Sequence, residues 1–168
     1  IRDSGNDADA VAAPDRNFCT DVDAMLSCLT TETRIVYLAN PDNPSGAILP
    51  GTELRRLHAG LPRDVLLVID GAYSEYVTNP AYEGGEALVR AHDNVVVTRS
   101  FSKIHGLAGA RVGWVYGPPH VIDTINRIGL TFPLATPSLH AAIAALKDRE
   151  HRNYCLLYTS DAADESVS

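Results

Sequence analysis

The chain has 168 residues, of which 45% are hydrophobic and 21% are charged, and its formal net charge is −7. This composition is ordinary for a globular protein, and the length corresponds to one domain or to part of a larger one. The excess of acids without a basic run argues against binding to nucleic acid or to an anionic membrane, so we expect small molecules as ligands.

The predicted elements alternate between helices and strands along the chain. Thr20, followed by acids at positions 21 and 23, predicts the N-cap of a short helix. After it come a strand at 34–39, a helix at 52–59 and a continuously apolar strand at 65–69. Next are a helix at 86–91, strands at 95–98 and 112–116, and a helix at 121–128. Thr136 and Pro137 predict the N-cap and first position of a last helix to about residue 150.

Strands that alternate with helices predict an α/β fold with a mostly parallel sheet. The sequence shows no internal repeat and no low-complexity linker, so we predict no domain boundary inside residues 14–150. Residues 1–13 are small and polar without a clear period, and we expect a poorly defined start there. Residues 151–168 lack a periodic pattern and are predicted to be a non-native or disordered tail.

Several classes of protein are disfavoured by what the sequence lacks. The cysteines are odd in number and widely spaced, which suits neither a disulfide framework nor a zinc site. The six histidines show no metal-ligand spacing, so we expect no metal. There is no apolar stretch of membrane-spanning length and no signal-peptide pattern, and we therefore expect a cytoplasmic protein.

Polar side chains gather where three of the predicted strands end. They are Asn43 in a turn after the first strand, Asp70 after the second, and residues 100–103 after the third. Taken singly, each of these residues has an ordinary structural explanation, since lysines are mostly exposed and Asp and Asn are common in caps and turns. Open α/β sheets bind ligands beyond the carboxyl ends of their strands, so the coincidence predicts a binding site at this edge.

Three strings carry a resemblance to a known family. They are Asn-Pro-Asp-Asn-Pro-Ser-Gly at 40–46, Asp-Gly-Ala-Tyr-Ser-Glu-Tyr at 70–76, and the segment from Ser100 to Trp114. In order and spacing these strings resemble the cofactor-site motifs of the fold-type-I aminotransferases, which use pyridoxal 5'-phosphate (PLP). Within them the match is closest to the histidinol-phosphate aminotransferase family, over roughly residues 14–150. The resemblance implies part of a PLP-binding large domain, three-layered α/β/α, with one antiparallel strand near 112–117.

The resemblance also assigns roles around the cofactor ring. It implies that Lys103 holds the cofactor aldehyde as an imine and later serves as base and acid in the proton transfers of transamination. It places Asp70 against the pyridine nitrogen, where a carboxylate keeps that nitrogen protonated. It places Asn43 and Tyr73 as hydrogen-bond partners of the ring's phenolate oxygen, with a cis peptide bond between Asn43 and Pro44.

The same resemblance predicts a phosphate anchor. Ser100, Ser102 and Arg111 supply hydroxyl and cationic donors, and a guanidinium can bind two phosphate oxygens at once. Gly106 and Gly109 are predicted to let the backbone turn between the lysine loop and the following strand. We expect His105 and Trp114 to be packing residues, Trp114 in the core.

The reaction implied is transfer of the amino group from L-histidinol phosphate to 2-oxoglutarate, a step of histidine biosynthesis, by a homodimer. Three alternatives remain open, namely a threonine-phosphate decarboxylase, an aromatic aminotransferase and the PLP-sensing domain of a transcription regulator. The unusual sequence at both termini also keeps open a further alternative, that the chain is a non-functional gene fragment. Because family elements such as the substrate-carboxylate arginine are not identifiable in this sequence, we expect this chain alone to be inactive.

Overall fold

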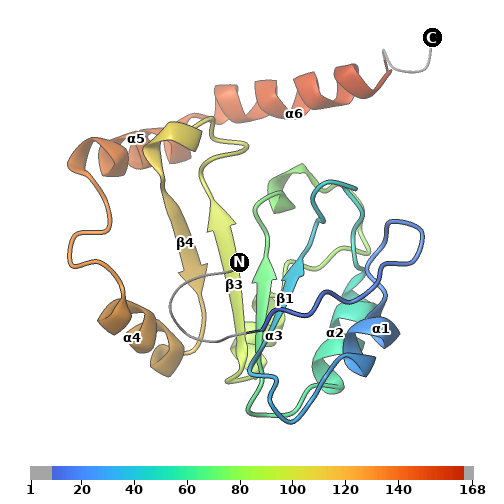
Figure 1. Cartoon of the computed structure of the whole chain (residues 1–168). Coiled ribbons are helices and arrows are strands. Elements are labelled where there is room, and N and C mark those ends of the chain that lie inside the picture. Colours follow the sequence, from blue (N-terminus) through green and yellow to red (C-terminus); the bar gives the residue numbers. More distant parts are fainter. Residues whose placement is uncertain (1–8, 165–168) are drawn as a thin grey trace.

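The computed structural model describes residues 9–164 of the chain, and side chains as far as residue 157. It contains a sheet flanked by helices (Figure 1). The strands are β1 (Ile35–Ala39), β2 (Leu66–Asp70), β3 (Val95–Ser100) and β4 (Gly113–Tyr116). The helices are α1 (Val22–Ser27), α2 (Gly51–Ala59), α3 (Glu86–Ala91), α4 (Pro119–Ile128), α5 (Thr136–Lys147) and α6 (Arg149–Asp164), with short 3-10 turns η1 (Ser74–Tyr76) and η2 (Ala108–Ala110).

The sheet is mixed, with strand order β1-β2-β3-β4. Strands β1, β2 and β3 are parallel, and β4 pairs antiparallel with β3 at the edge. The prediction of a mostly parallel α/β sheet with one antiparallel strand near 112–117 is therefore confirmed. The register pairs Ala39 with Asp70, and Asp70 with Thr98, so the carboxyl ends of the three parallel strands lie at one edge.

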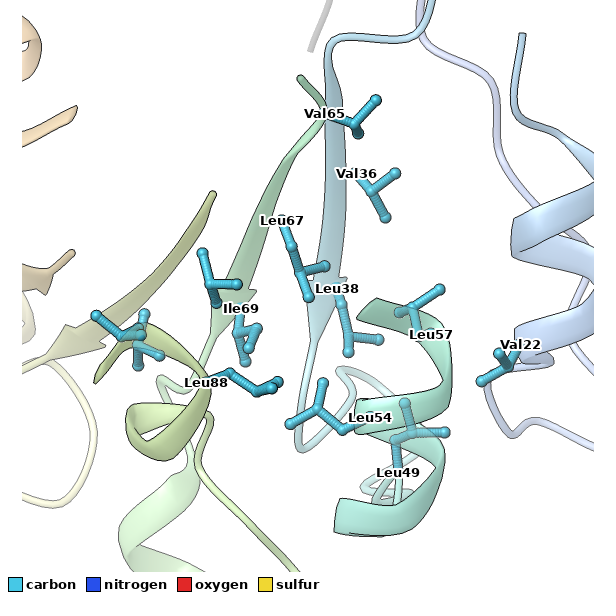
Figure 2. Close-up of a cluster of buried hydrophobic side chains, with 13 residues drawn as sticks. Val22, Val36, Leu38, Leu49, Leu54, Leu57, Val65, Leu67, Ile69 and Leu88 are labelled. Carbon is cyan, nitrogen blue, oxygen red and sulfur yellow. The ribbon is translucent and has the colours of Figure 1, made fainter. Parts of the chain in front are cut away.

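The main hydrophobic core lies between one face of the sheet and helices α1, α2 and α3. Figure 2 shows Leu54 and Leu57 of α2 facing Leu38 of β1, with Leu67 of β2 beside them. The side chains of Leu54, Leu57 and Leu67 have no exposed surface. Burying a leucine side chain contributes roughly 1.5–3 kcal/mol, so this cluster supplies much of the stability of the fold.

The opposite face of the sheet is more exposed among the described residues, above all on β1, although Val96 of β3 is buried there. On β1 the side chains alternate, so that Val36 and Leu38 are buried while Ile35 and Tyr37 are 60% and 53% exposed. The prediction that Trp114 lies in the core is wrong, because this residue is 47% exposed on the edge strand β4. An edge strand has a neighbour on one side only, which leaves its large side chains less covered.

Two predicted helix boundaries differ from the structure. The N-cap of α1 is Asp21 rather than Thr20, since the Asp21 carboxylate accepts hydrogen bonds from the backbone N–H groups of Asp23 and Ala24. These bonds, with the one from Ala24 the largest cause, lower the pKa of Asp21. Helix α5 has its N-cap at Ala135, so Thr136 is already helical.

The end of the chain also differs from the prediction. The helix expected to continue to about residue 150 stops at Lys147, and α6 starts at Arg149. The break lies at Asp148, whose carboxylate accepts a hydrogen bond from the backbone N–H of His151 at 2.9 Å, as an N-cap does. Helix α6 covers residues for which the sequence shows no periodic pattern, and the disordered or non-native character of the tail stays a prediction. Residues 1–8 and 165–168 lie outside the described residues.

Candidate active site

The candidate site lies at the carboxyl ends of β1, β2 and β3, at the upper edge of the sheet in Figure 1. The loop after β1 carries Asn43, β2 ends in Asp70, and β3 ends in Ser100 and leads to Lys103. Parallel neighbouring strands therefore bring three segments, separated by about thirty residues each in sequence, to one edge.

One chain of contacts joins Asn43, Tyr73 and Lys103. The side-chain amide of Asn43 donates a hydrogen bond to the Tyr73 hydroxyl at 3.3 Å. The ammonium of Lys103 lies 4.8 Å from the centre of the Tyr73 ring, within the range of a cation–π interaction. These three predicted site residues, one from each loop, are thus brought together. Lys103 itself is exposed, so its amine is accessible to a ligand.

The loop that carries Asn43 is held by buried polar contacts. Asn40 has no exposed surface, and its side chain both donates to the Leu49 carbonyl and accepts from the Leu49 N–H, at 3.1 and 2.9 Å. The Tyr82 hydroxyl donates to the backbone carbonyl of Asn40 at 2.9 Å. The Asn43–Pro44 peptide bond is cis, as predicted, and so is Asn40–Pro41.

Asp70 is held on both carboxylate oxygens. Its Oδ1 accepts a hydrogen bond from the backbone N–H of Ala72 at 3.0 Å, and its Oδ2 accepts one from the Tyr37 hydroxyl of the neighbouring strand. The next residue, Gly71, donates its N–H to the Thr98 carbonyl at 2.9 Å. Both ends of the Asp70 side chain and its backbone are therefore fixed.

A partly buried ion pair supports the segment that follows Asp70. Arg99, whose side chain is 9% exposed, donates to the Gly71 carbonyl at 3.0 Å and pairs with Glu86 at the start of α3. A carboxylate in the first turn of a helix interacts favourably with the helix dipole as well. The pair thus links β3, α3 and the loop of Asp70.

A second group of predicted residues gathers around the lysine loop. The N–H of Ser102 donates to the Ser100 hydroxyl at 3.0 Å, and Arg111 donates to the Ser102 hydroxyl at 3.4 Å and to the Ala108 carbonyl at 2.9 Å. Gly106 has φ of +66°, a left-handed conformation that favours glycine, as predicted, whereas Gly109 has no positive φ. Hydroxyls beside an exposed guanidinium form an arrangement that suits an anion. His105 stacks on Phe101, with ring centres 4.8 Å apart, and is a packing residue as expected.

A cavity of about 510 Å³ adjoins the site. It is lined by the loop after β1 and by the segment from Tyr73 to Asn79. Of the predicted residues, Asn43 and Tyr73 line this cavity, whereas Asp70, Lys103 and Arg111 do not. We predicted that these five residues would line one cleft, and two of the five line this cavity.

Sequence reasoning missed three side chains that hold the site, namely Tyr37, Asn40 and Arg99. A signal existed for two of them. Tyr37 lies two residues before Ala39, the partner of Asp70, so the period of a strand places both side chains on one face. Arg99 is a charged residue at the end of an apolar strand. Asn40 looked like an ordinary turn residue, and its burial follows from tertiary contacts alone.

In residues 9–164 the structure holds no group of three or more His, Cys, Asp and Glu side chains placed to bind a metal ion. Within the same range, none of the helices has the length and apolar character needed to cross a membrane.

The fold and the site together define a class. The model of the family "Aminotransferase class I and II" matches residues 2–164, and the chain belongs to this family. It is 48% identical, over 95% of its length, to the histidinol-phosphate aminotransferase of Nitrobacter winogradskyi. It is 55% identical, over 85% of its length, to the protein of the same name from Rhodospirillum centenum.

A solved structure extends the likeness to three dimensions. The histidinol-phosphate aminotransferase of Sinorhizobium meliloti, solved in complex with pyridoxal-5'-phosphate, is 35% identical and superposes with a TM-score of 0.77 over 84% of this chain. The match covers 38% of that protein, and 44% and 40% of the two relatives. The chain thus spans less than half the length of the proteins it matches.

Proposed function

We propose that the intact protein carrying this sequence is a PLP-dependent aminotransferase. It transfers the amino group of L-histidinol phosphate to 2-oxoglutarate, giving imidazole acetol phosphate and L-glutamate in histidine biosynthesis. The contact chain Asn43–Tyr73–Lys103 at the carboxyl edge of the sheet carries the proposal, because it brings the candidate lysine beside residues from the two neighbouring loops. The names of the relatives that match at 48% and 55% identity support the substrate.

The side chains present fit the chemistry of the cofactor. PLP has an aldehyde, a ring nitrogen, a phenolate oxygen and a phosphate, and it supplies an electron sink for the amino acid's Cα carbanion when bound. Lys103 offers an exposed amine for the aldehyde, and Asp70 a fixed carboxylate for the ring nitrogen. Asn43 and Tyr73 would donate hydrogen bonds to the phenolate oxygen.

The phosphate would be held by the second group of residues. Ser100 and Ser102 supply hydroxyls, and Arg111 supplies the positive charge and further N–H donors. We propose that residues 14–150 belong to the cofactor-binding domain of the intact protein.

The chain's own residues account for the proton transfers. With PLP and an amino acid bound, the Lys103 amine would be the group that takes the proton from the substrate's Cα and gives it back on the cofactor side. Asp70 holds the proton on the ring nitrogen, because a carboxylate beside a pyridinium stabilises the charged form. Tyr73, packed under the Lys103 ammonium, restricts where the amine can move.

The assay that tests this function measures L-glutamate formed from 2-oxoglutarate by the intact protein with PLP. We expect turnover with L-histidinol phosphate and much less with aromatic amino acids, and no decarboxylation of L-threonine O-3-phosphate. Turnover confined to an aromatic amino acid, or carbon dioxide release from the threonine phosphate, would replace this proposal with one of those activities. No turnover with any of them would refute the enzyme assignment.

The proposal includes a homodimer that works in the cytoplasm. Large apolar side chains at the end of α4 and in the segment after it are exposed, with Ile128, Leu130 and Phe132 between 79% and 88% exposed. Contiguous exposed apolar groups are typical of surfaces that become covered in an assembly. Sedimentation of the intact protein at twice the monomer mass is the expected result, and a monomeric active enzyme would contradict it.

A further inference from the structure

Tyr37 has no part in the proposed chemistry, yet it touches one of its central groups. It lies in the middle of β1 and points to the open face of the sheet. Because Ala39 pairs with Asp70 and side chains alternate along a strand, Tyr37 and Asp70 share this face. The Tyr37 hydroxyl donates a hydrogen bond to Asp70 Oδ2.

The hydrogen bond from Tyr37 fixes the Asp70 carboxylate and still leaves it able to accept a hydrogen bond from a ligand. Asp70 Oδ1 accepts from the Ala72 N–H at 3.0 Å and Oδ2 accepts from Tyr37, so each oxygen has one donor from the chain. Each carboxylate oxygen can accept more than one hydrogen bond, so capacity remains for a further N–H donor. With both oxygens bonded, rotation of the carboxylate would break at least one hydrogen bond to a charged acceptor.

We propose that Tyr37 is a positioning residue that orients the Asp70 carboxylate toward the cofactor's ring nitrogen. The inference rests on the proposed function, since it takes the ring nitrogen as the ligand of Asp70. The hydroxyl acts through Asp70 and needs no contact with the substrate. Removing it leaves the carboxylate held by Ala72 alone, so the cofactor must order that side chain on binding.

The surroundings of Tyr37 also keep its phenol protonated. Burial, the hydrogen bond to Asp70 and the negative charge of Asp70 together raise the pKa of Tyr37 to about 12. The phenol is therefore neutral, and able to donate, throughout the pH range in which the protein would work.

The test measures the effect of Tyr37→Phe on cofactor affinity in two backgrounds of the intact protein, the parent and Asp70→Ala. Tyr37→Phe should bind PLP about tenfold more weakly than the parent, by absorption titration, because one charge-assisted hydrogen bond is lost. Tyr116→Phe is the matched control, since it removes a hydroxyl from the same sheet that makes no side-chain hydrogen bond within the described part of the chain. In Asp70→Ala the further change Tyr37→Phe should have no effect on the dissociation constant, because the coupled group is already gone.

A second readout uses the apo protein. The ultraviolet difference between the parent and Tyr37→Phe reports the alkaline titration of Tyr37, and Asp70→Ala should move that titration from about pH 12 toward lower pH. Unchanged affinity in Tyr37→Phe, or an equal loss in the Asp70→Ala background, would overturn the positioning role. If the parent protein fails to bind PLP at all, the proposed function and the positioning role fall together, while the apo titration still shows whether the Tyr37–Asp70 contact exists.

Discussion

At the scale of single residues, the proposed site depends on one amine and one carboxylate whose roles no neighbouring side chain can take over. The chain contains two lysines, Lys103 and Lys147, and only the first follows a parallel strand of the sheet. Asp70 is the carboxylate at the end of the central parallel strand, with hydrogen bonds on both oxygens. These two residues allow the most direct tests of the proposed mechanism.

Replacing Lys103 by alanine should remove both the attachment of the cofactor and the proton transfers. In the intact protein we expect loss of the visible absorption band of lysine-bound PLP and loss of turnover. Lys147→Ala, at the end of α5, is the matched control and should keep both. A Lys103→Ala variant that retained the band would show that another amine holds the cofactor.

Replacing Asp70 by asparagine should separate binding from catalysis. The amide keeps the shape of the side chain, so PLP should still attach to Lys103, but it cannot hold the proton on the ring nitrogen by charge. Each tenfold loss of rate equals about 1.4 kcal/mol of transition-state stabilisation, and we expect a loss of several such factors in kcat. Near-normal turnover would reduce Asp70 to a structural cap.

At the scale of elements, the loops of the site are held by contacts between segments distant in sequence. Arg99 of β3 crosses to Glu86 of α3 and to the carbonyl of Gly71 after β2. A Cβ at Gly71 would lie 2.6 Å from the Arg99 Nη1 atom and 2.6 Å from the Ser74 hydroxyl. The absence of a side chain at this position is therefore what allows the guanidinium to reach the loop.

Gly71→Ala should consequently destabilise the protein although the change adds a single methyl group. The guanidinium is pinned by Glu86, so either the ion pair or the loop must shift, at about 1–3 kcal/mol. Gly109→Ala is the control, because a Cβ there meets nothing within 4 Å, and its effect should stay within about 0.5 kcal/mol. The measurement is the free energy of unfolding of both variants by denaturant titration. Equal values for Gly71→Ala and Gly109→Ala would contradict the packing described.

At the scale of the whole molecule, the two faces of the sheet are unequal. The face toward α1, α2 and α3 is buried, as Figure 2 shows for Leu67 and Leu38. On the opposite face Ile35 is 60% exposed. The larger buried cluster of the described fold therefore lies between these helices and the sheet, and a smaller one joins Phe101, Val112 and Ala142 of α5.

Truncation on the two faces should have different effects on the 168-residue chain. Leu67→Ala leaves a cavity in the buried face and should cost about 2–5 kcal/mol of unfolding free energy. Ile35→Ala, on the neighbouring strand, should cost about 0.5 kcal/mol or less. A loss at Ile35 as large as that at Leu67 would mean that the open face is covered in solution.

The sequence by itself determined the order of helices and strands as far as α5 and the motifs that identify the family. These features are local, because the period of apolar residues and the spacing of turn residues lie within single segments. The position of Asn43, Asp70 and Lys103 at one edge followed from the rule for parallel strands.

Only the tertiary structure decided which side chains hold those residues in place. The contacts from Tyr37 to Asp70 and from Arg99 to Glu86 depend on register between strands and on helix packing, which no single segment encodes. The same applies to the exposure of Trp114, since burial depends on what lies across the sheet rather than on the strand itself. Local pattern fixes the elements, whereas non-local register fixes the partners of each polar group.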